Sequence, residues 1–239
     1  IAGSDADIIV FETMTDIYEV KAAVLAAREN SDKPIIVTMT FEENRRTFTG
    51  CDIPSMAITL NGLGVSAIGL NCSLGPKELL PIIGELSKWT NLPLVVKPNA
   101  GLPDPITNTY DITPEEFASY VADMTNYGIR VVGGCCGTNP EYIKATIKKL
   151  STIHPNVEKK EIPSAVCSSS KTVVINQPRI IGERINPTGK KRFKEALKNN
   201  DLDYILGQAI EQAQGGAEIL DVNVGLPGID EKEMMIKTV

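Results

Sequence analysis

Five apolar segments that recur along the first 140 residues limit the folds open to this sequence more than any other feature. Each is rich in valine, isoleucine and leucine, and their starts lie roughly 26 to 36 residues apart; they occupy residues 7–14, 34–41, 67–74, 93–101 and 129–138. Such runs are typical of parallel strands that are buried on both faces. The segments between them are amphipathic and carry helix start signals, such as Thr113-Pro114-Glu115-Glu116. The pattern predicts alternating strands and helices.

This alternation predicts an α/β fold of parallel (β/α)8 TIM-barrel units, although an open doubly wound sheet has the same rhythm. A closed barrel needs eight units, and only five precede residue 150. Residues 1–150 are therefore interpreted as the C-terminal part of a barrel. The chain starts with Ile1 rather than methionine and ends within a helical pattern. We interpret it as an internal fragment of a longer polypeptide.

The periodicity stops at residue 151 and resumes later in the chain. Residues 151–178 are rich in serine, lysine and proline, which predicts an interdomain linker. A second α/β pattern then begins, with strands expected at 179–186 and 217–225 and helical segments between them. Residues 179–239 are interpreted as the N-terminal part of a second (β/α)8 barrel.

Charge and composition exclude some classes of partner. The formal net charge is −6, with 24 basic and 30 acidic residues, which argues against a nucleic-acid partner. No apolar run approaches the ~18 residues of a membrane span, and no signal peptide is visible, so no membrane partner is expected. An odd number of cysteines, five, favours a cytoplasmic location, where cysteines often bind metals or act in catalysis.

Three cysteines occur at predicted strand ends. Cys72 ends the third apolar segment, and Cys135 and Cys136 end the fifth among several glycines. All strands of a parallel barrel open their C-terminal ends onto one face, so these three sulfurs are expected to converge. Three thiolates supply three corners of a tetrahedral zinc site and leave the fourth open, as in catalytic zinc sites. A substrate thiol at the open position would be held as a reactive thiolate, which suits alkyl transfer to sulfur.

Other interpretations of these cysteines stay open on the pattern alone. Buried thiols without a ligand are common, and a glycine-rich turn after a late barrel strand can bind phosphate. A disulfide between neighbouring cysteines is strained and disfavoured in a reducing compartment. Cys51, Cys167 and His154 lie in loop-like or linker segments and are left outside the predicted site.

Two motifs around these cysteines resemble the homocysteine S-methyltransferase family. They are "GLNCSLGP" and "GGCCGTNPEYI", and the resemblance extends over residues 7–150. It implies that Cys72, Cys135 and Cys136 bind Zn²⁺ and that homocysteine is the substrate. The segment "FETMTDIYEVKAA" resembles the family's strand and helix whose first glutamate, here Glu12, contacts the amino group of homocysteine. Asn71, next to the first ligand, is predicted to orient the site.

The segment after the predicted linker resembles a pterin-binding domain. The motifs are "IIGERINPTGKKRFKEAL" and "GGAEILDVNVGLPGIDE", and the resemblance places Asn223, Glu183 and Asn186 near the pterin pocket. A homocysteine domain followed by this domain resembles the family of cobalamin-dependent methionine synthases. That order implies methylcobalamin as the immediate methyl donor and methyltetrahydrofolate as the methyl source. Cobalamin would be bound by a cobalamin-binding domain of the same parent polypeptide, outside this chain.

Two other functions remain as alternatives. One is a cobalamin-independent homocysteine S-methyltransferase that uses betaine or S-methylmethionine, against which the pterin-like segment speaks. The other is a non-catalytic scaffold whose cysteines bind a metal structurally or bind nothing. Since part of each barrel is missing on this interpretation, we expect little turnover from the 239 residues alone.

Overall fold

The computed structural model describes residues 3–104, 106–107, 109–154 and 159–239, and the chain divides into two compact units, Ile1–Val174 and Ile175–Val239. The strands of the first unit are β1 (Ile9–Met14), β2 (Ile35–Met39), β3 (Ala67–Asn71), β4 (Leu94–Lys97), β5 (Ile129–Val132), β6 (Ala165–Cys167) and β7 (Thr172–Val174). Its helices are α1 (Ile17–Asn30), α2 (Ile53–Gly62), α3 (Pro76–Leu86), α4 (Pro114–Met124), the 3₁₀ turn η1 (Thr125–Tyr127) and α5 (Pro140–Leu150).

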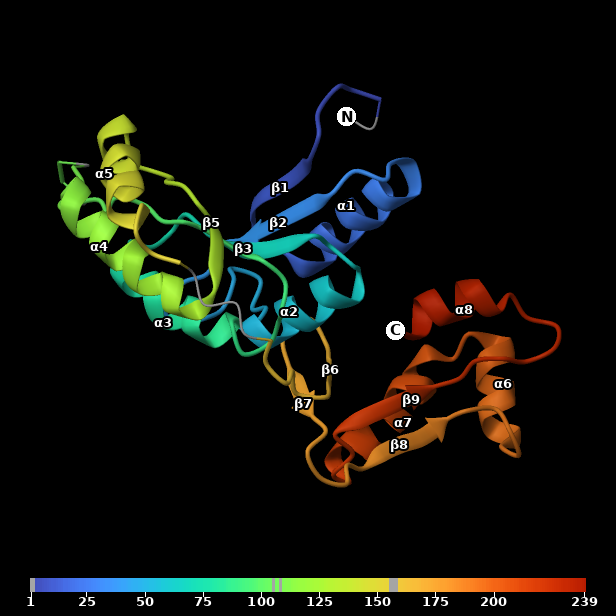
Figure 1. Cartoon of the computed structure of the whole chain (residues 1–239). Helices are drawn as coiled ribbons and strands as arrows, with labels where there is room; N and C mark the ends of the chain where they lie inside the picture. Colours follow the sequence, from blue (N-terminus) through green and yellow to red (C-terminus); the bar gives the residue numbers. More distant parts are fainter. Residues whose placement is uncertain (1–2, 105, 108, 155–158) are drawn as a thin grey trace. The chain divides into compact units, whose positions relative to one another are not determined.

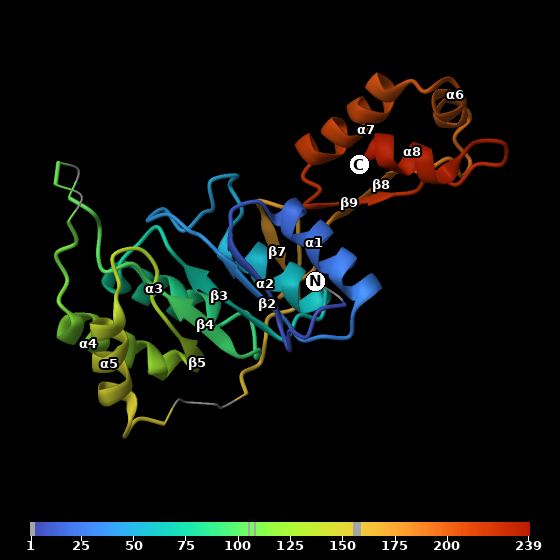
Figure 2. The ribbon, with the colours of Figure 1, turned by 90° about the horizontal axis from the view of Figure 1, so that it is seen from above.

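Strands β1 to β5 form one parallel sheet in which the order of the strands follows the chain. Figure 2 shows β2 to β5 in this order. Each of the helices α1 to α5 contacts the next one, so the helices form a continuous layer along the sheet (Figure 1). A doubly wound sheet reverses its strand order at a switch point, whereas a barrel adds strands in one direction. The predicted α/β fold with parallel barrel-type units is confirmed, and the described strands contain no such reversal.

Strand β3 lies at the centre of this sheet and is its most enclosed strand. All of its residues, Ala67–Asn71, are buried, whereas the edge strands β1 and β5 each expose part of their length. Gly69 has no side chain because the backbone of Val95 on β4 occupies the position that a Cβ would need. The end of β3, where Asn71 and Cys72 lie, is therefore held on both sides by neighbouring strands.

The end of the predicted linker forms a hairpin within the first unit. Strands β6 and β7 pair in an antiparallel manner, and β6 contacts helix α2 (Figure 1). The Ser55 and Thr172 hydroxyls lie 3.1 Å apart, and the Arg46 guanidinium donates to the Ser170 carbonyl at 2.9 Å. Three-residue strands carry too little alternation to be recognised in a serine-rich segment. Residues 155–158 of the predicted linker lie outside the described residues.

The second unit has two parallel strands, β8 (Ile181–Ile185) and β9 (Ile219–Val222), with helices α6 (Lys191–Asn199), α7 (Leu202–Gln214) and α8 (Glu231–Thr238). Its core includes Phe193, Leu197, Ile205 and Met234. Because β8 and β9 are parallel, their C-terminal ends lie at the same edge. Among the described residues of both units, no helix has the length and apolar character needed to cross a membrane.

Candidate metal centre

The structure brings the three predicted zinc ligands together at the C-terminal edge of the sheet. Cys72 directly follows β3, and its backbone N–H donates to the Lys97 carbonyl at the end of β4, at 3.1 Å. Cys135 lies in the loop after β5, and its backbone N–H donates to the Pro98 carbonyl at 2.8 Å. Both cysteine-bearing segments are therefore hydrogen-bonded to the C-terminal end of β4, which lies between β3 and β5 in the sheet.

The spacing of the sulfur atoms fits a tetrahedral zinc ion. The Sγ atoms of Cys72 and Cys136 are 3.8 Å apart, those of Cys135 and Cys136 are 4.0 Å apart, and all three lie within 4.8 Å of one another. With Zn–S bonds of about 2.3 Å, two sulfurs at corners of a tetrahedron lie about 3.8 Å apart. A disulfide needs a separation of about 2.05 Å, and the cysteines are free thiols. The arrangement is that of a thiol tripod able to hold zinc.

Unusual backbone conformations accompany this arrangement. Thr13 and Cys72 adopt positive φ angles of 59° and 60°, and Gly137 has a φ of 79°. Such conformations cost about 1–3 kcal/mol each in residues other than glycine and occur often at functional sites. At Gly137 a side chain is also excluded by space, because the ring of Tyr110 lies where a Cβ would be. Tyr110 thereby packs directly against the turn that carries the cysteine pair.

Asn71 connects the end of β1 with the thiols. Its side-chain amide donates to the Thr13 hydroxyl at 2.7 Å and lies 4.0 Å from the Cys135 Sγ, while its Oδ1 accepts from the Thr13 N–H at 3.0 Å. The side chain is buried, so these contacts hold it in one orientation. This position is compatible with the predicted orienting role, which stays a prediction.

Glu12, the residue predicted to contact the amino group of homocysteine, lies at the same edge of the sheet. Its carboxylate forms an ion pair with the Lys97 ammonium at 2.6 Å. Lys97 and Asn99 were not identified from the sequence, although both follow the apolar run of β4 in "PLVVKPNAG" and a strand-end rule would have found them. The Asn99 Oδ1 accepts from the Cys136 N–H at 3.1 Å and so helps to place that ligand.

Burial raises the pKa of two cysteine thiols, Cys135 in the tripod and Cys51 in the core. The pKa of Cys135 is raised to about 11, first by burial and then by its contact with Cys72. The pKa of the Tyr110 hydroxyl is also raised, by burial and by the neighbouring thiol groups of Cys136 and Cys72. Cys51 lies in the core, where burial above all raises its pKa to about 12, so it stays a neutral thiol away from the site.

Zinc affinity is expected to increase with pH. A thiol must lose its proton to bind zinc, and at pH 6–9 Cys135 still carries its proton because its pKa lies near 11. Because Cys135 must release one proton when zinc binds, this residue alone should make the zinc affinity rise about tenfold for each pH unit. Competition with a chelator of known affinity at several pH values measures this slope, and calorimetry counts the protons released. A flat profile between pH 6 and 9 would contradict the expectation.

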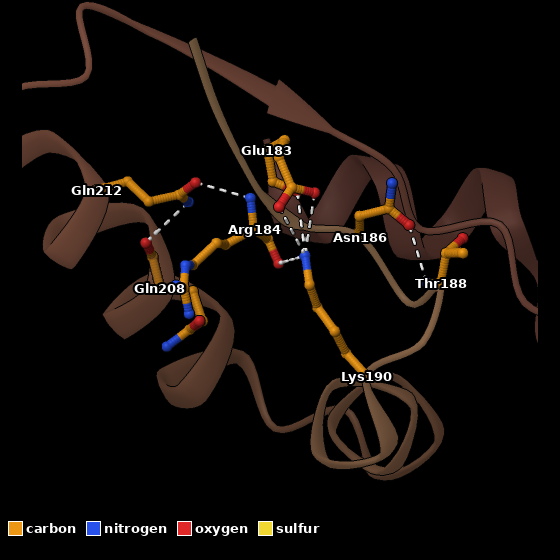
Figure 3. A network of polar contacts seen from close by, with 7 residues as sticks. All are labelled: Glu183, Arg184, Asn186, Thr188, Lys190, Gln208 and Gln212. Atoms are coloured by element: carbon orange, nitrogen blue, oxygen red, sulfur yellow. Dashed lines mark hydrogen bonds and ion pairs between the residues drawn. The ribbon is translucent and has the colours of Figure 1, made fainter. Parts of the chain in front are cut away.

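The residues predicted to lie near a pterin lie in or just after strands β8 and β9, and two of them, Glu183 and Asn186, are drawn in Figure 3. Glu183 on β8 pairs with the Lys190 ammonium at 3.1 Å, and the Asn186 Oδ1, just beyond β8, accepts from the Thr188 N–H at 2.9 Å (Figure 3). Asn223 follows β9, and its Oδ1 accepts from the Gly225 N–H at 2.9 Å. Asn186 and Asn223 therefore lie at the C-terminal edge of the same strand pair, and their role in pterin binding stays a prediction.

Comparison with protein families and relatives agrees with the family resemblance drawn from the sequence. The sequence model of the homocysteine S-methyltransferase family matches residues 1–150. A protein named methionine synthase from Mycobacterium leprae (strain TN) is 34% identical in an alignment that covers 93% of this chain and 20% of that protein. A methionine synthase from Mycobacterium tuberculosis (strain ATCC 25618 / H37Rv) is 33% identical, covering 94% and 20%. The chain thus spans about a fifth of the length of these relatives.

Solved structures give the same answer for the fold. The crystal structure of the homocysteine methyltransferase MmuM from Escherichia coli, in its metallated form, superposes with a TM-score of 0.52 at 25% identity. The match covers 61% of this chain and 46% of that one. The apo form of the same protein gives a TM-score of 0.51, again at 25% identity, and the match covers 50% of that chain.

Proposed function

The chain belongs to the homocysteine S-methyltransferase family, and on this premise we propose that its first unit takes part in methylation of the homocysteine sulfur to give methionine. The observation that carries the proposal is the thiol tripod of Cys72, Cys135 and Cys136, whose sulfur spacing fits three ligands of one zinc ion. Three protein ligands leave a fourth position for a substrate atom, as in catalytic zinc sites. The thiol of homocysteine is the matching group.

The chain's own residues would bind and orient the substrate. Bound Zn²⁺ would lower the pKa of the homocysteine thiol and keep its sulfur nucleophilic at neutral pH. Asn71 would hold the Cys135 side of the tripod in place, and Glu12 would bind the ammonium group of the substrate. In the reaction the homocysteine sulfur would form a bond to the methyl carbon while the bond between the methyl group and its donor breaks, its electron pair staying on the donor; the thiol proton leaves to solvent.

We assign the remaining parts of the chain on the same basis. Residues 1–150 would be the later part of the homocysteine and zinc-binding barrel, residues 151–178 the connection, and residues 179–239 the start of a pterin-binding barrel. The alignment with the relatives named methionine synthase covers 93% and 94% of this chain, which supports a common function for both units. Methylcobalamin, carried by a domain outside this chain, would be the immediate donor. Methyltetrahydrofolate would be the methyl source, with Glu183, Asn186 and Asn223 near its pterin ring.

Direct methylation by S-methylmethionine or betaine is a second candidate function. The similarity to a solved homocysteine methyltransferase covers 61% of this chain and leaves the methyl donor open. The two candidates differ in one requirement, since only the first needs added methylcobalamin. Little turnover is expected from the 239 residues alone, because they span about a fifth of the related methionine synthases. Robust methionine formation by the chain alone would contradict that expectation.

Zinc X-ray absorption spectroscopy tests the proposed substrate position. The zinc-loaded chain should show three sulfur neighbours and one lighter atom, and addition of L-homocysteine should increase the sulfur count to four. L-homoserine, which has a hydroxyl in place of the thiol, is the matched control and should leave the shell unchanged. Four sulfur neighbours that do not respond to homocysteine, or no zinc binding, would contradict the proposal.

A further inference from the structure

The ion pair between Glu12 and Lys97 lies at the same C-terminal edge of the sheet as the thiol tripod. The carboxylate and the ammonium are 2.6 Å apart; the Lys97 side chain is 19% exposed and the Glu12 side chain 46%. Both residues come from the C-terminal parts of their strands, β1 and β4, which are separated in the sheet by β2 and β3. The pair therefore crosses the open edge of the sheet rather than linking neighbouring strands.

Lys97 is positioned by contacts with the segments that carry the metal ligands. It pairs with Asn71 in the register of β3 and β4, and its carbonyl accepts the N–H of Cys72. Its aliphatic stem lies close to Gly133, where a Cβ would come within 3.0 Å of the lysine Cγ. These contacts direct the lysine along the edge of the sheet while its ammonium reaches Glu12.

Glu12 is tied to the tripod through a short chain of side chains. Thr13, its neighbour, exchanges two hydrogen bonds with Asn71, and the amide of Asn71 lies 4.0 Å from the Cys135 Sγ. The side chain of Asn71 thus links the end of β1 to Cys135, a predicted metal ligand. Both partners of the ion pair are thus joined to the tripod by direct contacts, Glu12 through Thr13 and Asn71, and Lys97 through the backbone of Cys72.

Homocysteine has three groups that a binding site must satisfy: a thiol, an ammonium and a carboxylate. The tripod accounts for the thiol, and Glu12 accounts for the ammonium. We propose, building on the proposed function, that Lys97 binds the carboxylate of homocysteine and that the Glu12–Lys97 pair opens to admit the substrate. The ammonium of the substrate then faces Glu12 and its carboxylate faces Lys97.

This exchange leaves no charge without a partner. Before binding, the two side chains neutralise each other; after binding, each is neutralised by the oppositely charged end of the zwitterion. Both side chains are partly exposed, so opening the pair costs little compared with a buried pair. The long lysine side chain can move its ammonium without any change in the backbone.

The assignment is tested by comparing how tightly homocysteine and a second thiol bind to the full chain loaded with Co²⁺. The sulfur-to-metal absorption bands of Co²⁺ report thiol binding. The second thiol is 3-mercaptopropylamine, which is homocysteine without its carboxylate. Wild-type protein should bind homocysteine more tightly by about tenfold or more, the scale of a charge-assisted hydrogen bond. Lys97→Gln should weaken homocysteine binding by roughly ten- to a hundredfold. It should leave 3-mercaptopropylamine binding unchanged or tighter, because Glu12 is then free.

Two variants serve as controls. Lys97→Arg keeps the positive charge and should retain most of the preference for homocysteine. Lys149→Gln makes the lysine-to-glutamine change on an exposed residue in the last turn of α5, and this variant should bind both thiols like wild type. Equal affinity of the wild-type protein for the two thiols would overturn the role of Lys97 whatever the variants do. An equal loss for both thiols in Lys97→Gln would do the same. Failure of both thiols to bind at the metal would overturn the proposed function itself, and this assignment with it.

Discussion

Replacement of Cys72 by serine is expected to lower the zinc affinity of the chain by roughly a thousandfold. Zinc sites in proteins bind with about 10–16 kcal/mol at neutral pH, so one of a few ligands accounts for several kcal/mol, and about 4 kcal/mol is a thousandfold change. A serine hydroxyl does not ionise at neutral pH and is a poor zinc ligand, yet it is close to cysteine in size. The tripod would lose the corner supplied by β3, and with it the substrate position and the methyl transfer.

The matched control for this variant is Cys167→Ser. Cys167 lies in the β6–β7 hairpin, with its Sγ 3.6 Å from the Thr59 hydroxyl and 3.8 Å from the Ser55 carbonyl, and it belongs to no metal cluster within the described residues. Chelator competition should give wild-type zinc affinity for this control and the large loss for Cys72→Ser. Cys135→Ser and Cys136→Ser should resemble Cys72→Ser. Wild-type zinc affinity in Cys72→Ser would show that the tripod is not the metal site.

Substitution of Gly69 by alanine should destabilise the first unit by about 3 kcal/mol or more. Overpacking of a core costs about 1–3 kcal/mol when side chains can adjust. At Gly69 the obstacle is the backbone of Val95 on the adjacent strand, which cannot move without separating β3 from β4. These two strands carry Asn71, Cys72 and Lys97, so the same shift should also weaken metal binding.

Gly62→Ala, near the end of helix α2, is the control for a glycine-to-alanine change. A Cβ at Gly62 meets no atom within 4 Å, and alanine favours a helix by up to about 1 kcal/mol over glycine. Urea unfolding of the full chain should therefore give an unchanged or slightly raised free energy for Gly62→Ala and a large loss for Gly69→Ala. Equal stabilities for the two variants would show that β3 and β4 adapt more easily than their packing indicates.

Much of the fold could be predicted because strand and helix signals lie close together in the sequence. The apolar runs at 67–74 and 93–101 contain β3 and β4, and the capping pattern at Thr113 marks the start of α4. The predicted segments were longer than the strands because the apolar runs continue into the loops that carry the site. The β6–β7 hairpin was not predicted, since its stability comes from contacts with α2 rather than from its own pattern.

The candidate site was likewise predicted from the sequence only in part. The three cysteines were identified from strand-end placement and family resemblance, and the structure brings their sulfurs together. Lys97 and Asn99 could have been found from their place at the end of β4, but their partners could not, because Glu12 and the cysteine-bearing turn are distant in sequence. Tyr110 follows no strand, and its contact with the same turn is equally distant. Nothing in the residues next to Lys97 indicates that its ammonium pairs with a carboxylate 85 positions earlier.

The sequence by itself determined the type and order of the elements in the sheet region and the end of the sheet at which the thiols lie. These properties follow from local periodicity and from the common direction of parallel strands. Only the tertiary structure decided that the sulfurs approach to 3.8–4.0 Å and that Glu12 meets Lys97. Such distances depend on the register between strands and on loop conformations with positive φ at Thr13 and Cys72. Packing imposes both, because no single segment favours them alone.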